Sequence, residues 1–222
     1  MGCDLKKVRD IFLDRDGTII EDRHYASLPD DIVLLPGAGE ALAALSQAGC
    51  RFFVVSNQSG LGRGYFSLAD LEACHKRLQE LLAVYGVFFT AIRYCPHDPS
   101  LEQCDCRKPR TGLWVKLQQE FGLNPHNCLM VGDKLADLRF GQRAGFAASV
   151  LVLTGQGERT AKKNNLRLPP EQDRLDFSLP PENLGQDGES QKYSPVPPPR
   201  EETRLFATHN LGGFCRILLG RA

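Results

Sequence analysis

A short apolar run that ends in two closely spaced carboxylates constrains this chain more than any other feature. The run covers Val8 to Leu13, interrupted by Arg9 and Asp10, and Asp14-Arg15-Asp16-Gly17-Thr18 follows directly. A run of this length, bounded by turn-forming residues, predicts a buried strand. Carboxylates crowded at the end of a buried strand are costly unless a cation compensates them. Active sites of parallel α/β proteins lie at that edge of the sheet, so the run predicts both a fold class and a site.

Length and charge favour one α/β domain and exclude several other classes of protein. The 222 residues are enough to bury a substantial core. The formal net charge is zero, so we expect no nucleic-acid partner, and any anionic ligand must be held by a local group of cations. No stretch approaches about eighteen consecutive apolar residues, and the apolar segment behind the basic N-terminus is too short for a signal peptide. We therefore expect no membrane span and a cytoplasmic protein.

Segments typical of strands and helices alternate along the first 157 residues. Short apolar runs that stop at small polar residues predict further strands, and amphipathic segments between them predict helices. Near-continuous apolar strands separated by helices indicate an α/β fold with a Rossmann-like parallel sheet sandwiched by helices. Beyond the first strand, the predicted strands cover 51–55, 91–94, 128–131 and 149–153, and the predicted helices cover 38–48, 67–85, 111–122 and 135–144.

The composition divides the chain into three parts. Residues 1–157 form the α/β core, without a large cap domain. Residues 158–204 are polar and rich in proline, and they cannot bury enough apolar surface to offset the entropy of ordering. We expect an irregular or disordered insert there. Residues 205–222 are candidates for a last strand and a last short helix of the core.

Three aspartates follow two of the predicted strands. Asp14 and Asp16 end the first strand, and Asp133 follows the strand that ends at Val131. Neighbouring parallel strands would bring these carboxylates together, where they repel one another unless a divalent cation lies among them. Magnesium prefers such oxygen ligands and is often shared with a substrate phosphate. The alternative is that an aspartate after a strand only forms a turn, and for Asp133 alone that would be the better interpretation.

Two further residues are candidates for holding a phosphoryl group. Ser56 follows the second strand and offers a hydroxyl donor, whereas Lys108 precedes Pro109 and offers a cation. Near the carboxylates, a lysine would neutralise and orient a phosphoryl group. Taken singly, Ser56 is equally consistent with a turn residue, and Lys108 with Arg107 is equally consistent with a solvated surface pair.

Three of the eight cysteines and one histidine form two short pairs joined by a loop. The pairs are Cys95-Pro96-His97 and Cys104-Asp105-Cys106. In a reducing compartment such a cluster indicates metal binding more than disulfides. Three thiolates and one imidazole suit a tetrahedral zinc site, and four protein ligands favour a structural role. The alternative is a set of free thiols. The loop over 95–106 leads into Arg107 and Lys108, so a bound zinc would fix where these cations point.

Four motifs in order resemble those of the haloacid dehalogenase (HAD) superfamily of phosphatases. They are Asp14-x-Asp16-Gly17-Thr18, Ser56-Asn57-Gln58, Lys108-Pro109 and Gly132-Asp133-Lys134-x-x-Asp137. The resemblance implies a HAD-like fold and phosphomonoester hydrolysis through an aspartyl-phosphate. It implies that Asp14 is the nucleophile and Asp16 the general acid and base. Magnesium is then expected on Asp14, the backbone carbonyl of Asp16 and Asp133, with Ser56 and Lys108 on the phosphoryl oxygens.

Within the superfamily, the zinc loop followed by residues 106–109 resembles two related groups. One group is the D-glycero-D-manno-heptose 1,7-bisphosphate phosphatases, which act in lipopolysaccharide-precursor biosynthesis, and the other is the histidinol-phosphate phosphatases. Residues 56–66 and 132–137 and a flap with His24-Tyr25 resemble the heptose group. The expected reaction is therefore removal of the 7-phosphate of the heptose bisphosphate, with histidinol phosphate as the alternative substrate.

The same resemblance implies a small-molecule sugar phosphate as the partner and, since the family members without a cap are often monomers, a monomeric protein. Arg107 is expected to reach the phosphate that is not cleaved. Two features depart from the heptose group, namely Ser56 in place of the common threonine and the long insert after Gly157. The expected substrate contacts are Asp22, Arg23, His24, Tyr25, Ser56, Asn57, Gln58, Ser59, Arg107, Lys108 and Lys134.

An interpretation from a different class is a catalytically silent binding module. In that case the proline-rich segment 195–200 would recruit partners as a polyproline ligand. Every catalytic position of the motifs is intact, so the enzyme is the favoured interpretation.

Overall fold

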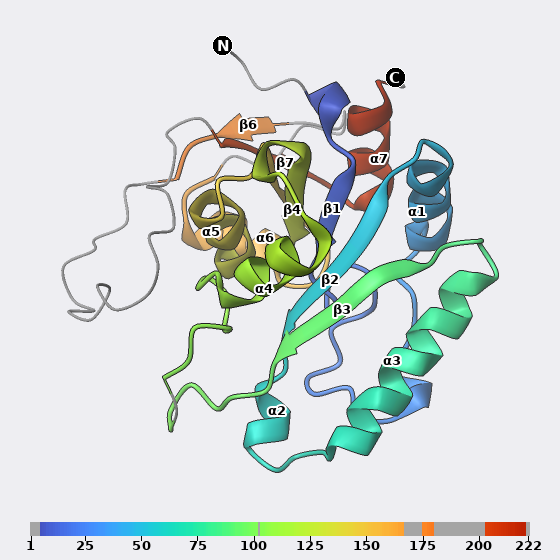
Figure 1. The fold of residues 1–222 in the computed structure, drawn as a ribbon, viewed down its shortest axis with the longest axis vertical. Coiled ribbons are helices and arrows are strands. Elements are labelled where there is room, and N and C mark those ends of the chain that lie inside the picture. Colours follow the sequence, from blue (N-terminus) through green and yellow to red (C-terminus); the bar gives the residue numbers. More distant parts are fainter. Residues whose placement is uncertain (1–4, 102, 167–174, 180–202, 221–222) are drawn as a thin grey trace.

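A seven-stranded sheet forms the centre of the part of the chain that the structure describes (Figure 1). This computed structural model describes residues 5–101, 103–166, 175–179 and 203–220. The strand order is β3-β2-β1-β4-β5-β7-β6, and every pair is parallel except the antiparallel pair of β6 and β7. The predicted parallel sheet is confirmed. The strands are β1 (Asp10–Leu13), β2 (Arg51–Asn57), β3 (Phe89–Cys95), β4 (Cys128–Gly132), β5 (Ala148–Val152), β6 (Leu175–Phe177) and β7 (Arg204–Thr208).

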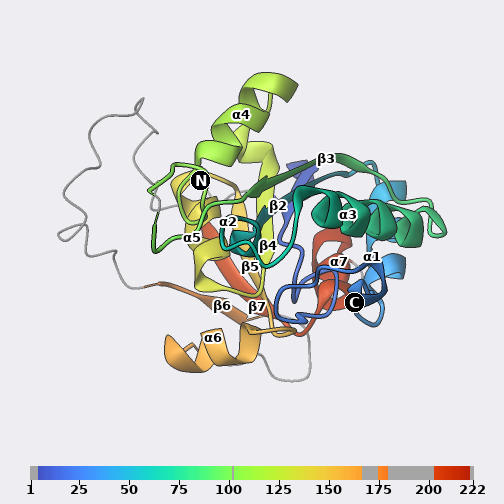
Figure 2. The same ribbon diagram turned by 90° about the horizontal axis from the view of Figure 1, so that it is seen from below.

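Helices cover both faces of the sheet. Helices α1, α3 and α7 pack on one face, whereas α4, α5 and α6 pack on the other, and Figure 2 shows the sheet between the two layers. The predicted sandwich of helices around a parallel sheet is therefore confirmed. The helices are α1 (Ala38–Gln47), α2 (Ser59–Gly62), α3 (Leu68–Ala83), α4 (Gly112–Phe121), α5 (Leu135–Arg143), α6 (Gly157–Lys163) and α7 (Leu211–Leu219).

The central strand β1 is apolar because both of its faces are buried. Ile11 and Leu13 belong to the core under α1, α3 and α7, whereas Phe12 points to the opposite face. There the Phe12 ring stacks on Phe53 at 5.0 Å between centroids and meets the edge of Trp114 at 5.6 Å. Such aromatic pairs stabilise a core beyond the area that they bury. A strand enclosed in this way shows no polar alternation in its sequence.

The register of β1 with its two neighbours decides where the site lies. Leu13 is level with Val54 of β2 on one side and with Val131 of β4 on the other. The residues that follow these three positions therefore leave the sheet at the same edge. The polar residues at the ends of β1, β2 and β4 therefore lie together at the edge where these parallel strands end.

The structure contains regular elements that the sequence did not predict. Most of helix α6, which begins at Gly157, and all of strand β6 fall in residues 158–204, which were expected to be an irregular or disordered insert. Helix α6 buries Ala161 against Leu138 of α5, Leu151 of β5 and Ala207 of β7. A single small buried residue gives no apolar periodicity, so the sequence carried little sign of this helix. Residues 167–174 and 180–202, including the proline-rich segment 195–200, lie outside the described residues.

The end of the described chain returns to the sheet. Strand β7 pairs with β5, and α7 packs against α1. Helix α7 begins at Leu211, where the Asn210 side chain caps it by accepting a hydrogen bond from the backbone N–H of Gly213. The division of the chain at residues 157 and 204 stays a prediction. Among the described residues, no helix is both long and apolar enough to cross a membrane.

Candidate active site

Asp14 and Lys108 form a buried ion pair at the carboxyl edge of the sheet. The Lys108 Nζ atom lies 2.7 Å from Asp14 Oδ1 and 2.6 Å from Asp137 Oδ1, and it also donates to the Val55 carbonyl oxygen at 2.6 Å. Burial alone would raise the pKa of Asp14, but the charges of Lys108 and Lys134 outweigh it and lower this pKa to about 2. Asp14 is therefore an ionised carboxylate near neutral pH, as a nucleophile must be.

Lys134 lies among the oxygens that were expected to hold magnesium. Its Nζ atom is 3.4 Å from Asp14 Oδ2, 3.2 Å from the backbone oxygen of Asp16 and 2.8 Å from Asp133 Oδ1. One ammonium group thus contacts all three predicted ligand groups. Because these oxygens already converge on one cation, their chemistry and placement fit a hard divalent ion.

Asp133 is fully buried, and its pKa depends on the groups around it. Burial, and then the charge of Asp14, raise the pKa of Asp133 to about 7. Its Oδ2 atom accepts from the backbone N–H of Gln156 at 2.8 Å, and Gly17 lies so close that an added Cβ would collide with the same oxygen. Gly17 also has a positive φ of 81°, so two constraints favour glycine at this turn. A bound divalent cation would favour the ionised form of Asp133.

Asp16, Ser56 and Gln58 form a second group beside Asp14. The Gln58 Nε2 atom donates to Asp16 Oδ2 at 2.9 Å and to Ser56 Oγ at 2.8 Å. Arg15 also donates to both carboxylate oxygens of Asp16. The structure therefore brings together the predicted catalytic residues Asp14, Asp16, Ser56 and Lys108.

Asn57 forms two hydrogen bonds with the backbone of Lys108. Its Nδ2 atom donates to the Lys108 carbonyl oxygen at 3.1 Å, and its Oδ1 atom accepts from the Lys108 N–H at 3.0 Å. Both ends of the amide are occupied, so Asn57 holds the loop of Lys108 against the end of β2. The Lys108–Pro109 peptide bond that follows is cis.

The predicted flap lies next to α2. Asp22 Oδ2 accepts from Gln156 Nε2 at 2.9 Å, whereas Arg23 pairs with Glu21 on the surface. His24 and Tyr25 have positive φ angles of 38° and 70°, which is uncommon for side chains of their size. The Tyr25 ring meets the Tyr65 ring edge-on at 4.9 Å between centroids. The flap therefore carries Asp22 to the site edge, while the Arg23 side chain turns to Glu21.

Gly60 at the start of α2 allows the flap to come close to this helix. An added Cβ on Gly60 would collide with the rings of Phe66 and Tyr25, so only glycine permits this approach. Ser59 is nearly buried at the first position of the same helix.

Arg107 lies after the cysteine loop, and its Nη1 atom is buried without a hydrogen-bond partner among the described residues.

Sequence reasoning gave no role to four residues that support this site. Asp137 pairs with Lys108 and also accepts from the Lys134 N–H at 3.0 Å through Oδ2. Arg15 pairs with Asp16, and Gln156 and Thr160 hold Asp133 through its side chain and its carbonyl oxygen. The fourth motif contained Asp137 but gave it no role. Arg15 carried no signal beyond its place between two aspartates.

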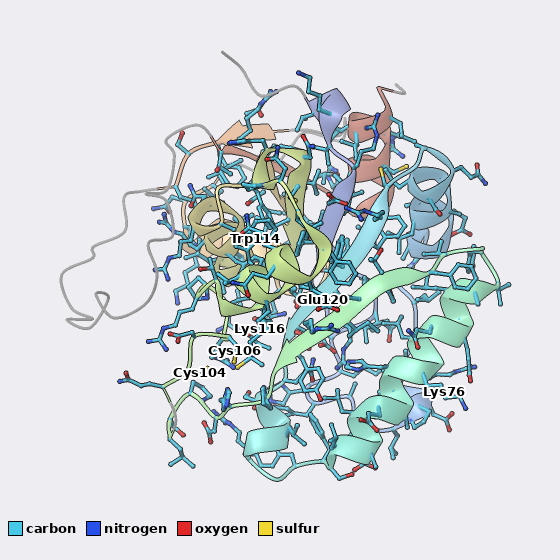
Figure 3. The ribbon with its side chains drawn as sticks, in the orientation of Figure 1. Lys76, Cys104, Cys106, Trp114, Lys116 and Glu120 are labelled. Carbon is cyan, nitrogen blue, oxygen red and sulfur yellow. The ribbon has the colours of Figure 1, made fainter. Side chains whose placement is uncertain are left out.

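The structure brings the four predicted zinc ligands together. The Cys95 Sγ atom lies 3.5 Å from Cys104 Sγ and 3.5 Å from His97 Nδ1, and that nitrogen lies 3.2 Å from Cys106 Sγ. All four ligand atoms lie within 4.8 Å of one another. A tetrahedron with zinc–sulfur bonds of about 2.3 Å places its sulfurs about 3.8 Å apart, so this group could bind zinc. Figure 3 shows Cys104 and Cys106 on the loop between β3 and α4.

Replacing one ligand should remove the metal and loosen the loop. We expect about one zinc per chain in the purified protein and clearly less in a Cys104→Ser variant. Loss of a structural zinc removes folding free energy, and a loss of a few kcal/mol corresponds to a Tm that is roughly 5–10 °C lower for a chain of this size. Metal analysis and thermal unfolding measure both effects.

Cys50→Ser, a change at a cysteine outside the loop, is the matched control and should keep its zinc. Unchanged zinc content and Tm in Cys104→Ser would contradict the structural-zinc assignment.

Known proteins are similar to this chain in both sequence and fold. Over 154 residues, it is 44% identical to the D-glycero-beta-D-manno-heptose-1,7-bisphosphate 7-phosphatase of Pseudomonas aeruginosa, and the match covers 69% of this chain and 85% of that enzyme. The chain belongs to the family of these phosphatases. A family model described as HAD-hydrolase-like matches residues 105–174. The expected membership of the HAD superfamily, in its heptose bisphosphate phosphatase group, is confirmed.

Solved structures of this phosphatase family have the same architecture. The D,D-heptose 1,7-bisphosphate phosphatase from B. bronchiseptica, complexed with magnesium and phosphate, matches with a TM-score of 0.74 and 30% identity, over 97% of this chain and 100% of that chain. The enzyme from Burkholderia thailandensis matches with a TM-score of 0.60 and 29% identity, over 95% and 98% of the two chains. The predicted HAD-like fold is therefore confirmed.

Proposed function

We propose that this protein is a magnesium-dependent phosphatase that removes the 7-phosphate of D-glycero-D-manno-heptose 1,7-bisphosphate. The observation that carries the proposal is the buried group around Asp14, in which two lysines face three aspartates at the carboxyl edge of the sheet. Family membership supports the substrate, since the relatives are named for this bisphosphate. Phosphoryl transfer depends on positioning and charge neutralisation, and this group supplies both.

The residues divide the reaction into two transfers. In the first, an oxygen of Asp14 attacks the phosphorus, the bond to the leaving alkoxide oxygen breaks, and that oxygen keeps the electron pair and takes a proton from Asp16. In the second, a water attacks the phosphorus of the aspartyl-phosphate and gives its proton to Asp16. Inorganic phosphate leaves, and the Asp14 carboxylate is restored. Lys108 and Ser56 hold phosphoryl oxygens through both transfers.

The three groups around the Lys134 ammonium are the proposed metal ligands. Asp14, the backbone oxygen of Asp16 and Asp133 would hold magnesium, which when bound neutralises charge on the phosphoryl oxygens. In this arrangement the Lys134 side chain would turn toward the substrate. The expectations of a monomeric and cytoplasmic protein stay predictions.

Arg107 is the proposed contact to the phosphate that is not cleaved. The Arg107 Nη1 atom is buried and has no hydrogen-bond partner in the described part of the chain, which costs free energy, and a phosphate oxygen is an acceptor that would satisfy it. The same residue would then favour a bisphosphate over histidinol phosphate. We therefore propose the heptose bisphosphate as the preferred substrate of the two.

Arg107→Met should reduce kcat/KM for the heptose bisphosphate by roughly 10- to 100-fold, as expected for the loss of a charged hydrogen bond. Phosphate release from the bisphosphate, from heptose 7-phosphate and from histidinol phosphate measures this. The monophosphate is the matched control, because it lacks the phosphate that Arg107 would hold, and its kcat/KM should change little. An equal loss on both heptose phosphates would contradict the assignment of Arg107. A wild-type preference for histidinol phosphate would overturn the proposed substrate.

A further inference from the structure

A buried cation lies behind Asp16. Arg15 is 1% exposed, and it donates from Nε to Asp16 Oδ2 at 3.0 Å and from Nη2 to Asp16 Oδ1 at 2.9 Å. A bidentate pair of this kind fixes the plane of the carboxyl group as well as its location. The Asp16 side chain is 19% exposed. The pair therefore holds the carboxyl group at the accessible side and the guanidinium in the interior.

Gln58 holds the same carboxyl group from the end of β2. Its Oε1 atom accepts from Arg15 Nη2 at 3.2 Å, while its Nε2 atom donates to Asp16 Oδ2 at 2.9 Å and to Ser56 Oγ at 2.8 Å. One amide thus connects Asp16, the cation behind it and a proposed phosphoryl-oxygen donor. Both oxygens of Asp16 are held by directional contacts, so the carboxyl group cannot rotate without breaking at least one of them.

Among the described residues, Arg15 has no second carboxylate partner that competes with Asp16. Asp16 is the carboxylate that pairs with Arg15 within the described part of the chain. Two titratable groups of α3 lie near Arg15. Burial raises the pKa of the Cys74 thiol, and burial, then the charge of Arg15, lower the pKa of His75 to about 4, so both groups are neutral near pH 7. A neutral imidazole does not draw the guanidinium away from Asp16.

Stability alone is a weak explanation for this arrangement. Taking an arginine out of water costs several kcal/mol, and apolar residues of similar volume often replace a buried ion pair without loss of stability. A role in orienting Asp16 explains why the chain keeps a charged side chain there.

We propose that Arg15 and Gln58 are positioning residues, which hold the Asp16 carboxyl group where it protonates the leaving oxygen; this role rests on the proposed phosphatase function. Proton transfer requires hydrogen-bond reach between the acid and the oxygen. As the bond from phosphorus to the leaving oxygen breaks, an alkoxide needs the proton from Asp16. A p-nitrophenolate is stable without it.

Comparing substrates with different leaving groups therefore distinguishes a loss of Asp16 positioning from general damage to the structure. We would measure kcat/KM, which includes only steps up to the transfer to Asp14, for the sugar phosphate and for p-nitrophenyl phosphate. The variants are Arg15→Lys, which keeps the charge but loses the bidentate pair, and Gln58→Met. The matched control is Arg51→Lys, which changes an arginine that pairs with Asp10 at the other end of β1.

We expect Arg15→Lys to lower kcat/KM for the sugar phosphate by about 100-fold and for p-nitrophenyl phosphate by no more than about threefold. Gln58→Met should show the same direction, and Arg51→Lys should leave both values unchanged. Equal losses on both esters in a folded Arg15→Lys protein would overturn the positioning role while leaving the phosphatase intact. A wild-type protein that hydrolyses neither ester would instead overturn the proposed function, and the positioning role with it.

Discussion

Replacing Lys108 with methionine is expected to destabilise the protein and to abolish phosphate release. The Lys108 ammonium is buried between Asp14 and Asp137, at 2.7 and 2.6 Å from their oxygens. Methionine fills a similar volume but leaves Asp137 without its cation, and it leaves Asp14 with only the more distant Lys134. Breaking a buried pair in this way costs about 3–5 kcal/mol, which lowers the Tm by roughly 6–20 °C. Losing a preorganised cation on the phosphoryl group should lower kcat at least about 1,000-fold.

Two controls separate the two effects of Lys108. Lys76→Met removes a lysine whose side chain is 79% exposed on α3, and it should change neither the Tm nor kcat (Figure 3). Adding Asp137→Asn to Lys108→Met removes the carboxylate that is left without a cation. The double variant should therefore recover part of the lost Tm but none of the lost rate. Thermal unfolding and a phosphate-release assay measure these outcomes, and a Lys108→Met protein with normal Tm and kcat would contradict the assigned contacts.

The placement of the central site was predictable because it depends on strand ends. Asp14, Ser56 and Asp133 each follow an apolar run, and parallel pairing in register brings such positions to one edge. The zinc ligands were also predictable, because two short pairs in one loop restrict the geometry. Local patterns made these residues candidates, and the resemblance to the HAD superfamily gave them their expected roles.

The partners of these residues were not predictable, since they come from distant parts of the chain. The spacing of Asp137 from Lys134 fits a helix cap, and Asp137 does cap α5, but only the folded chain shows that it also pairs with Lys108. Asn57 was expected to touch the substrate, yet its amide is occupied by the backbone of Lys108. Helix α6 brings Thr160 to the Asp133 carbonyl oxygen from a segment whose composition indicated no regular structure.

The central claim is that Asp14 is the nucleophile. Asp14→Asn keeps the shape of the side chain but removes the attacking carboxylate, so phosphate release from the heptose bisphosphate should fall at least about 1,000-fold. Asp10→Asn, which lies at the start of β1 and pairs with Arg51, is the matched control and should keep its activity.

The most direct measurement is the search for the covalent intermediate. Wild-type protein, quenched with acid during turnover and digested, should carry a phosphoryl group on the peptide that contains Asp14, whereas folded Asp14→Asn protein should carry none. Full phosphate release by Asp14→Asn, or a phosphoryl group found on a different residue of the wild-type protein, would contradict the account.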